Sequence, residues 1–196
     1  MIKIPCHCGN IIESDMNTEI DLASTPEIYA RIIDGTFMTF SCPQCGNELK
    51  TEVELHLFDK GEDFDIQFLP ELERANFLSG GITATSKRIA IGYNELVEKT
   101  IIAGTKLDDR IIEIIKFRML EKADKDNLSI TFNSVEGSDL VFHIAGLKPD
   151  QIGISHIPMS VYQNLENKID ELLVDDDIKL FTDGPYVSVS RVYLED

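Results

Sequence analysis

Short stretches of alternating hydrophobic and polar residues dominate the first part of the chain. They predict strands at residues 2–4, 11–22, 36–41, 48–58, 64–68 and 87–91, with a hairpin turn at 59–63. In the segment 48–58, Val53, Leu55 and Leu57 fall on one face, which is typical of a half-buried strand. This part of the chain is therefore expected to fold as antiparallel β-structure.

Apolar residues at helical spacing interrupt and follow these strands. They predict helices at residues 26–34, 94–103, 108–122 and 158–174, and a short helix after Pro70. For the first helix, Ser24 or Thr25 can cap the N-terminus, Pro26 suits the first helical position and Gly35 ends it. The segment 108–122 is apolar on more than one face. Such a helix is buried between layers or in an oligomer contact, and burial within the chain is the default interpretation.

The last third of the chain predicts two further hairpins on either side of the helix at 158–174. One joins strands at 128–132 and 140–144, and the other joins 178–181 to 186–194. A polar break at 124–127 suggests a boundary between domains at 1–124 and 125–196. The expected class is α+β: a zinc-ribbon-like antiparallel β-module with helices, followed by a β-rich C-terminal segment with one helix.

The net charge and the distribution of apolar residues limit the classes of function that are expected. The 196 residues carry a formal net charge of −17, which repels phosphate backbones. Arg31 is the single basic residue between Cys6 and Cys45, so a nucleic-acid-binding ribbon is not expected. The chain has no long uncharged apolar run and no apolar signal core at its start, which favours a cytoplasmic protein without a membrane segment.

Four cysteines in two tight pairs carry the clearest chemistry. The pairs are Cys6-His7-Cys8-Gly9 and Cys42-Pro43-Gln44-Cys45-Gly46, and the chain has no other cysteine. Two such turns brought together form a four-thiolate site that suits zinc, with a glycine closing each turn at positive φ. A site that includes His7 and a disulfide or redox pair are the alternatives. Redox Cys-x-x-Cys motifs favour a βαβ context, whereas these flanks are predicted to be antiparallel strands.

If Cys6, Cys8, Cys42 and Cys45 fill all four positions, the zinc is structural, because no position stays open for a substrate water.

These residues resemble the CpXC domain proteins of bacteria and archaea, which carry two Cys-Pro-x-Cys motifs. The similarity includes Thr25-Pro26-Glu27, Asp34-Gly35, Leu57-Phe58-Asp59, Tyr93–Lys99 and Leu107–Glu113. Cys42 and Cys45 match the motif, whereas the first motif departs from it: the family pattern implies cysteine at position 5 and proline at position 6, and the chain has Pro5 and Cys6. The resemblance implies a paired-thiol module and no particular reaction.

Other potentially reactive groups have simpler interpretations. His56 is expected to be a surface histidine or one that supports a neighbouring ligand, and Asp175-Asp176-Asp177 is expected to be a solvated turn. Two function classes remain. The favoured one is a non-catalytic protein-interaction or scaffold module with a protein partner or as a homo-oligomer, supported by the surplus apolar surface of helix 108–122. The alternative is an enzyme with a site between the two halves that uses histidine and carboxylate groups, such as His143, His156 or the acidic pairs.

Overall fold

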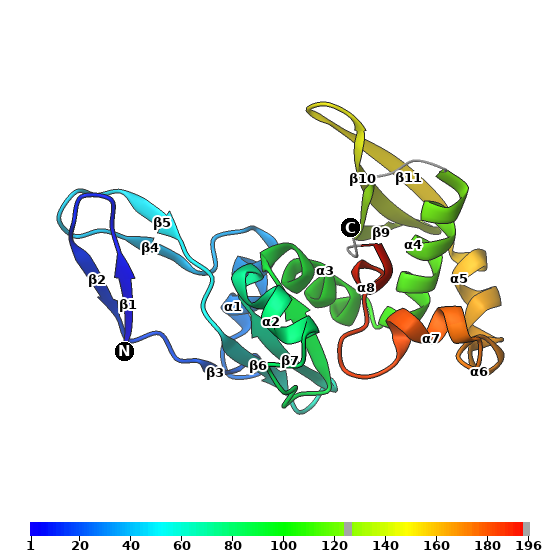
Figure 1. Ribbon diagram of the computed structural model, residues 1–196, viewed down its shortest axis with the longest axis horizontal. Helices are drawn as coiled ribbons and strands as arrows, with labels where there is room; N and C mark the ends of the chain where they lie inside the picture. Colours follow the sequence, from blue (N-terminus) through cyan, green and yellow to red (C-terminus); the bar gives the residue numbers. More distant parts are fainter. Residues whose placement is uncertain (124–126, 194–196) are drawn as a thin grey trace. The chain divides into compact units, whose positions relative to one another are not determined.

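The computed structural model describes residues 1–123 and 127–193 and divides into two compact units, Met1–Val97 and Glu98–Asp196 (Figure 1). Helices and antiparallel strands are mixed in the chain, and the predicted α+β class is confirmed. The predicted boundary between residues 124 and 125 lies outside the described residues and stays a prediction.

The first unit begins with a ribbon made of two β-hairpins. Strands β1 (Ile2–Pro5) and β2 (Ile11–Ser14) form the first hairpin, and β4 (Thr39–Ser41) and β5 (Glu48–Lys50) form the second (Figure 1). Each hairpin turns at one of the thiol pairs. The core of the ribbon is small: its buried residues are Ile4, Cys6, Ile12 and Cys42. Two of these four are thiols, so apolar burial alone supplies little of the ribbon's stability.

The first unit also contains a four-stranded sheet. Its strands run in the order β3 (Glu19–Asp21), β6 (Leu55–Asp59), β7 (Phe64–Leu69) and β8 (Arg88–Ile91). The β6–β7 pair is antiparallel and closes at the predicted turn, whereas β3 and β8 pair in parallel with their neighbours. Helix η1 (Glu71–Glu73) and helix α2 (Arg74–Leu78) follow β7, where a short helix was predicted after Pro70.

The prediction of one continuous strand at residues 48–58 is wrong. The segment forms β5 in the ribbon and β6 in the sheet, and the residues between them cross from one to the other. Glu52 stabilises this crossing, because its carboxylate accepts hydrogen bonds from the backbone N–H of Glu71 at 2.6 Å and of Tyr93 at 2.8 Å. Polar–apolar alternation continues through the crossing and therefore conceals the break.

Helix α1 (Pro26–Ile33) confirms the predicted helix, with Pro26 in its first turn and Gly35 at φ 81° after its end. The expected side-chain cap is absent. The hydroxyl of Thr25 instead donates to the carbonyl of Asp21 at 2.8 Å, and that of Ser24 donates to the Asp21 carboxylate at 3.1 Å. These bonds fix the turn that connects β3 to α1.

The second unit packs helices on a three-stranded antiparallel sheet. Helix α3 (Tyr93–Gly104) begins in the last residues of the first unit and continues into the second, where α4 (Asp109–Ala123) follows it. Strands β9 (Ser129–Glu136), β10 (Asp139–Lys148) and β11 (Gln151–Pro158) come next and lie in the order β11-β10-β9. The predicted β9–β10 hairpin is confirmed. Phe132 and Phe142 face each other across it, with ring centroids 5.5 Å apart, and both are fully buried.

The end of the chain is more helical than the sequence pattern suggests. The region predicted as one helix at 158–174 forms α5 (Met159–Glu166) and α6 (Ile169–Leu172). The predicted closing hairpin is wrong, because the segments predicted as its two strands form helices α7 (Asp176–Thr182) and α8 (Ser190–Tyr193). The physical reason is a helix cap, since the Asp175 carboxylate accepts hydrogen bonds from the backbone N–H of Asp177 and Ile178.

Helix α4 lies inside the second unit. Ile111, Ile112, Ile114 and Ile115 are all buried in the core, so the apolar surplus predicted for this helix is not a free surface. Phe117, Met119 and Leu120 pack against the same core. The default interpretation, burial within the chain, is therefore confirmed, and this helix does not support a partner surface.

Candidate metal centre

The two thiol corners have nearly the same backbone hydrogen bonds. In the first corner, the Cys6 N–H donates to the Asn10 carbonyl at 2.8 Å, and in the second the Cys42 N–H donates to the Asn47 carbonyl at 2.8 Å. Gly9 and Gly46 then donate to the carbonyls of Cys6 and Cys42, each at 2.9 Å. Both glycines have positive φ, 87° and 72°. The corners are thus equivalent turns of different length, since the first contains one residue fewer between its thiols.

This equivalence explains how the chain accommodates its departure from the Cys-Pro-x-Cys pattern. Pro5 is the last residue of β1 rather than part of the turn. The shorter turn still closes with the same donor and acceptor positions as the longer one.

The four sulfurs form one cluster. The Cys6 and Cys45 Sγ atoms are 3.6 Å apart and those of Cys8 and Cys42 are 3.7 Å apart, and all four lie within 4.8 Å of one another. Four thiolates bound to zinc at about 2.3 Å have sulfurs about 3.8 Å apart in a tetrahedron. The spacing therefore fits a tetrahedral metal ion. All four cysteines are free thiols.

The cluster cannot readily hold several negative charges by itself. Burial opposes ionisation of Cys42, but hydrogen bonds from the backbone N–H groups of Cys45 and Gln44 and from the Asn10 side chain lower its pKa to about 6. A backbone hydrogen bond acts in the same direction at Cys6, but burial and the neighbouring thiols outweigh it and raise its pKa to about 12. Ionisation of one thiol thus opposes ionisation of the neighbouring thiols. A bound cation would relieve the repulsion between the thiolates.

Burial divides the four thiols into two kinds. Cys6 and Cys42 belong to the ribbon core, whereas Cys8 and Cys45 are exposed at its surface. His7 is also exposed and lies outside the cluster of possible ligands among the described residues. Asn10, whose amide lies 3.6 Å from the Cys42 sulfur, is a contributor that the cysteine spacing does not reveal.

Both thiol corners lie in a region of the chain that is similar to known proteins. The CpXC protein family matches residues 4–116, more than half of the chain and including both thiol corners. The chain belongs to the CpXC family. An uncharacterised protein of Treponema pallidum (strain Nichols) is 27% identical over 193 residues, covering 86% of this chain and 88% of its own length. No solved structure matches this CpXC protein.

The histidines proposed for an enzyme do not form a recognisable catalytic group. By strand register Val141 lies opposite His156 and His143 lies opposite Ile154, so the two histidines share one face of the sheet in diagonal positions. His56 instead contacts two carboxylates. Its Nδ1 lies 2.7 Å from a carboxylate oxygen of Glu19, and its Nε2 lies 2.6 Å from a carboxylate oxygen of Asp65. Burial lowers the pKa of His56, but these two carboxylates outweigh it and raise the pKa above 6.5.

A buried charge cluster in the second unit was not predicted. The Lys116 ammonium donates to Glu98 at 3.0 Å and to Glu113 at 2.9 Å, and the Lys99 ammonium donates to Asp109 at 2.8 Å. These five side chains are nearly inaccessible to solvent. A signal was present, because Glu113 and Lys116 interrupt the most apolar segment of α4 at a spacing of one helical turn.

Within residues 1–123 and 127–193, no helix is long and apolar enough to cross a membrane.

Proposed function

We propose that Cys6, Cys8, Cys42 and Cys45 bind one zinc ion as a structural site. The spacing of the sulfurs supports this most directly, because the Cys6–Cys45 and Cys8–Cys42 distances match the edge of a zinc–thiolate tetrahedron and all four sulfurs lie within 4.8 Å of one another. With four protein ligands, no position remains for a substrate, so the ion joins the two hairpins and performs no reaction. Zinc sites of this kind contribute about 10 kcal/mol or more of apparent binding energy.

Metal content tests this proposal. Protein purified without chelator is expected to contain one zinc ion per chain, and Cys42→Ser is expected to lose it. His7→Ala is the matched control, since it changes an exposed neighbour of two thiols and should retain the metal. Less than about half an equivalent of metal, with four thiols titratable in the native protein, would count against the site.

We further propose that the protein is a non-catalytic interaction module, and an exposed strand edge supports this role. Among the described residues, the outer edge of β11 has no hydrogen-bonding strand, whereas the outer edge of the sheet at β9 is partly covered: the Phe132 N–H donates to Glu98 at 2.6 Å. Strand β11 contains no Asp, Glu, Lys or Arg, and Ile152 and Ile154 are 59% and 62% exposed. An uncharged, apolar edge is a template for pairing with another chain.

The occupant that best fits this edge is β11 of a second copy. Antiparallel pairing of two copies centred on Ile154 places Ile154 opposite its own counterpart. It also places Ile152 of each copy opposite His156 of the other, on the same face as the pair of Ile154 side chains. The net charge of −17 on each copy opposes self-association, so the pairing depends on the backbone hydrogen bonds and apolar contacts along this edge.

Molar mass in solution tests the pairing. Light scattering after size-exclusion chromatography should give a dimer that Ile154→Lys converts to a monomer. Val174→Lys, which alters another exposed apolar residue of the same unit, should remain dimeric. A wild-type monomer over the whole concentration range would refute self-pairing, and a different protein recovered on β11 would assign the edge to that partner instead. An enzymatic role for His143 and His156 stays a prediction without a supporting contact.

A further inference from the structure

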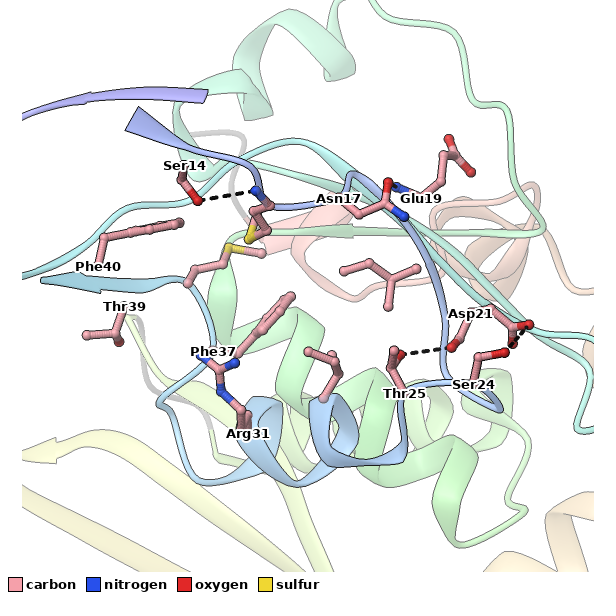
Figure 2. A pocket seen from close by; sticks show the side chains of 14 residues that line it. Ser14, Asn17, Glu19, Asp21, Ser24, Thr25, Arg31, Phe37, Thr39 and Phe40 are labelled. Carbon is pink, nitrogen blue, oxygen red and sulfur yellow. Dashed lines mark hydrogen bonds between the residues drawn. The ribbon is translucent and has the colours of Figure 1, made fainter. Parts of the chain in front are cut away.

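A cavity of about 470 Å³ lies beside the ribbon in the first unit (Figure 2). Its size is within the range of small-molecule sites. Every residue that lines it falls between Ser14 and Phe40, and therefore between the first thiol pair and the second. The chain segment that forms the cavity thus begins and ends at the two corners of the metal centre.

Most of the surface of the cavity is apolar, and its walls come from several elements. They include Met16 before β3, Ile20 in β3, Ile28 in α1 and the segment Phe37–Phe40 leading into β4. Figure 2 shows Phe37 and Phe40 on the opposite side of the cavity from Asp21, Ser24 and Thr25.

The charged groups at the rim already have partners within the chain. Glu19 pairs with His56, the Asp21 carboxylate accepts from the Ala23 N–H and the Ser24 hydroxyl, and Arg31 donates to the Thr36 carbonyl. Each of these groups therefore has a hydrogen-bond partner in the absence of a ligand. The acidic balance of the chain, 35 Asp and Glu against 18 Lys and Arg, further disfavours an anion.

Met38, in the wall of the cavity, has an unfavourable backbone conformation. It is 1% exposed and has a φ of 61°, a conformation that costs a non-glycine residue free energy and that concentrates at binding sites. Its carbonyl accepts a hydrogen bond from the Thr51 N–H at 3.1 Å, directly after β5. The strained residue is therefore attached to the second hairpin of the ribbon.

Phe40 connects the cavity to the thiols. It lines the cavity, and it also packs against the ribbon core that contains Cys6 and Cys42. Ser41 alone separates it from Cys42 along the chain. On the other side, β2 runs from the first corner to Ser14, which also lines the cavity. Both ends of the cavity wall thus depend on the position of the thiol corners.

From these contacts we infer that the cavity binds a compact, uncharged apolar molecule and that its affinity depends on the metal at the four thiols. The dependence on metal rests on the proposed zinc site, whereas the binding itself does not. Metal bound by both corners fixes β2 and β4, and with them the two sides of the cavity. Coupling of this kind is reciprocal, so an occupied cavity also retains the metal more tightly.

Fluorescence titration with the neutral apolar dye N-phenylnaphthylamine tests binding. The metal-loaded full chain should bind one dye saturably, and Ile28→Glu, which puts a charge in the wall, should weaken binding at least about tenfold. Ile33→Glu is the matched control on the same helix, because Ile33 is 42% exposed and does not line the cavity. Retained metal and unchanged circular dichroism show that Ile28→Glu still folds, and Ile28→Ala provides a milder second variant.

Three results would overturn the assigned site. These are non-saturable binding, equal binding by Ile28→Glu and Ile33→Glu, and tighter binding of the anionic dye anilinonaphthalene sulfonate, which would contradict the uncharged ligand class.

Repeating the titration after removal of the metal tests the coupling. The dye should bind at least about fivefold more weakly to metal-free protein, and Phe40→Ala should reduce this ratio toward one. Equal affinity with and without metal would overturn the coupling. Metal analysis of the same samples separates the hypotheses: a chain that never holds metal yet binds dye refutes the zinc site and leaves the cavity as a binding site.

Discussion

The ribbon and the second unit are stabilised in different ways. The ribbon has four buried core residues, two of which are thiols, and its strands are three or four residues long. Among the described residues, the second unit has a core cluster of fourteen buried hydrophobic residues and also encloses five charged side chains. Small β-structures without a sufficient apolar core generally require a metal or a covalent link. The comparison therefore assigns the stability of one region to its thiol centre and that of the other to packing.

Removing the metal should have the largest effect, and only the ribbon should unfold. Loss of about 10 kcal/mol of apparent binding energy exceeds what four buried residues supply. Hydrogen exchange after chelation should show rapid exchange in β1, β2, β4 and β5, with α4 and β10 still protected. Uniform loss of protection in both regions would contradict a separate source of stability.

Lys116→Met should produce the next largest effect, in the second unit. It leaves Glu98 and Glu113 buried without their shared counter-charge, which should lower the free energy of unfolding by about 3–5 kcal/mol. Burial already raises the pKa of Glu98, and the two carboxylates raise the pKa of Lys116 in spite of its burial. Urea unfolding measures the loss. Lys179→Met, which removes an exposed ion pair with Asp176, should cost less than about 1 kcal/mol.

Matched truncations compare the two cores directly. Ile112→Val in α4 should lower the free energy of unfolding by about 1 kcal/mol, since Ile112 is fully buried. Ile12→Val in β2 should instead appear as weaker metal retention in chelator competition, with the urea midpoint of the second unit unchanged. If Ile12→Val moved that midpoint as far as Ile112→Val does, the two regions would share one core.

The smallest effect concerns pH and the sheet of the first unit. Because the pKa of His56 is raised by Asp65 and Glu19, its stabilisation is fully present below about pH 6.5 and is lost as the pH rises through the higher folded-state value. His56→Gln should therefore reduce stability more at about pH 5 than at about pH 9. Thermal unfolding at both values measures this. If His56→Gln lowered the stability more at about pH 9 than at about pH 5, His56 would be neutral in the folded protein.

The sequence predicted those features that depend on local chemistry. The thiol pairs with Gly9 and Gly46 indicated the two corners, and Pro26 and Gly35 indicated the bounds of α1, because these residue types have few alternative uses. Their clustering required the fold, since residues far apart in the chain must meet.

Features that depend on distant contacts were missed. The apolar residues from Ile178 to Phe181 are too few to distinguish a strand from a helix, and the Asp175 cap decided between them. The break after β5 depends on Glu52 reaching Glu71 and Tyr93, which no local pattern displays. The pairing of Glu98 with Lys116 likewise joins two helices, and no local sequence pattern identifies these partners.

The position of the thiol corners also orders the assembly of the chain during synthesis. All four ribbon strands and all four cysteines lie within residues 2–50, so the ribbon is complete once Lys50 has emerged. Strand β3 has been made by then, but its partner β6 has not. The proposed metal, if bound at that stage, would close the loop between the corners in advance and reduce the loop-closure entropy left for later pairing. A cell short of metal would therefore accumulate chains in which β3 meets β6 without that restraint, and such chains would fold more slowly.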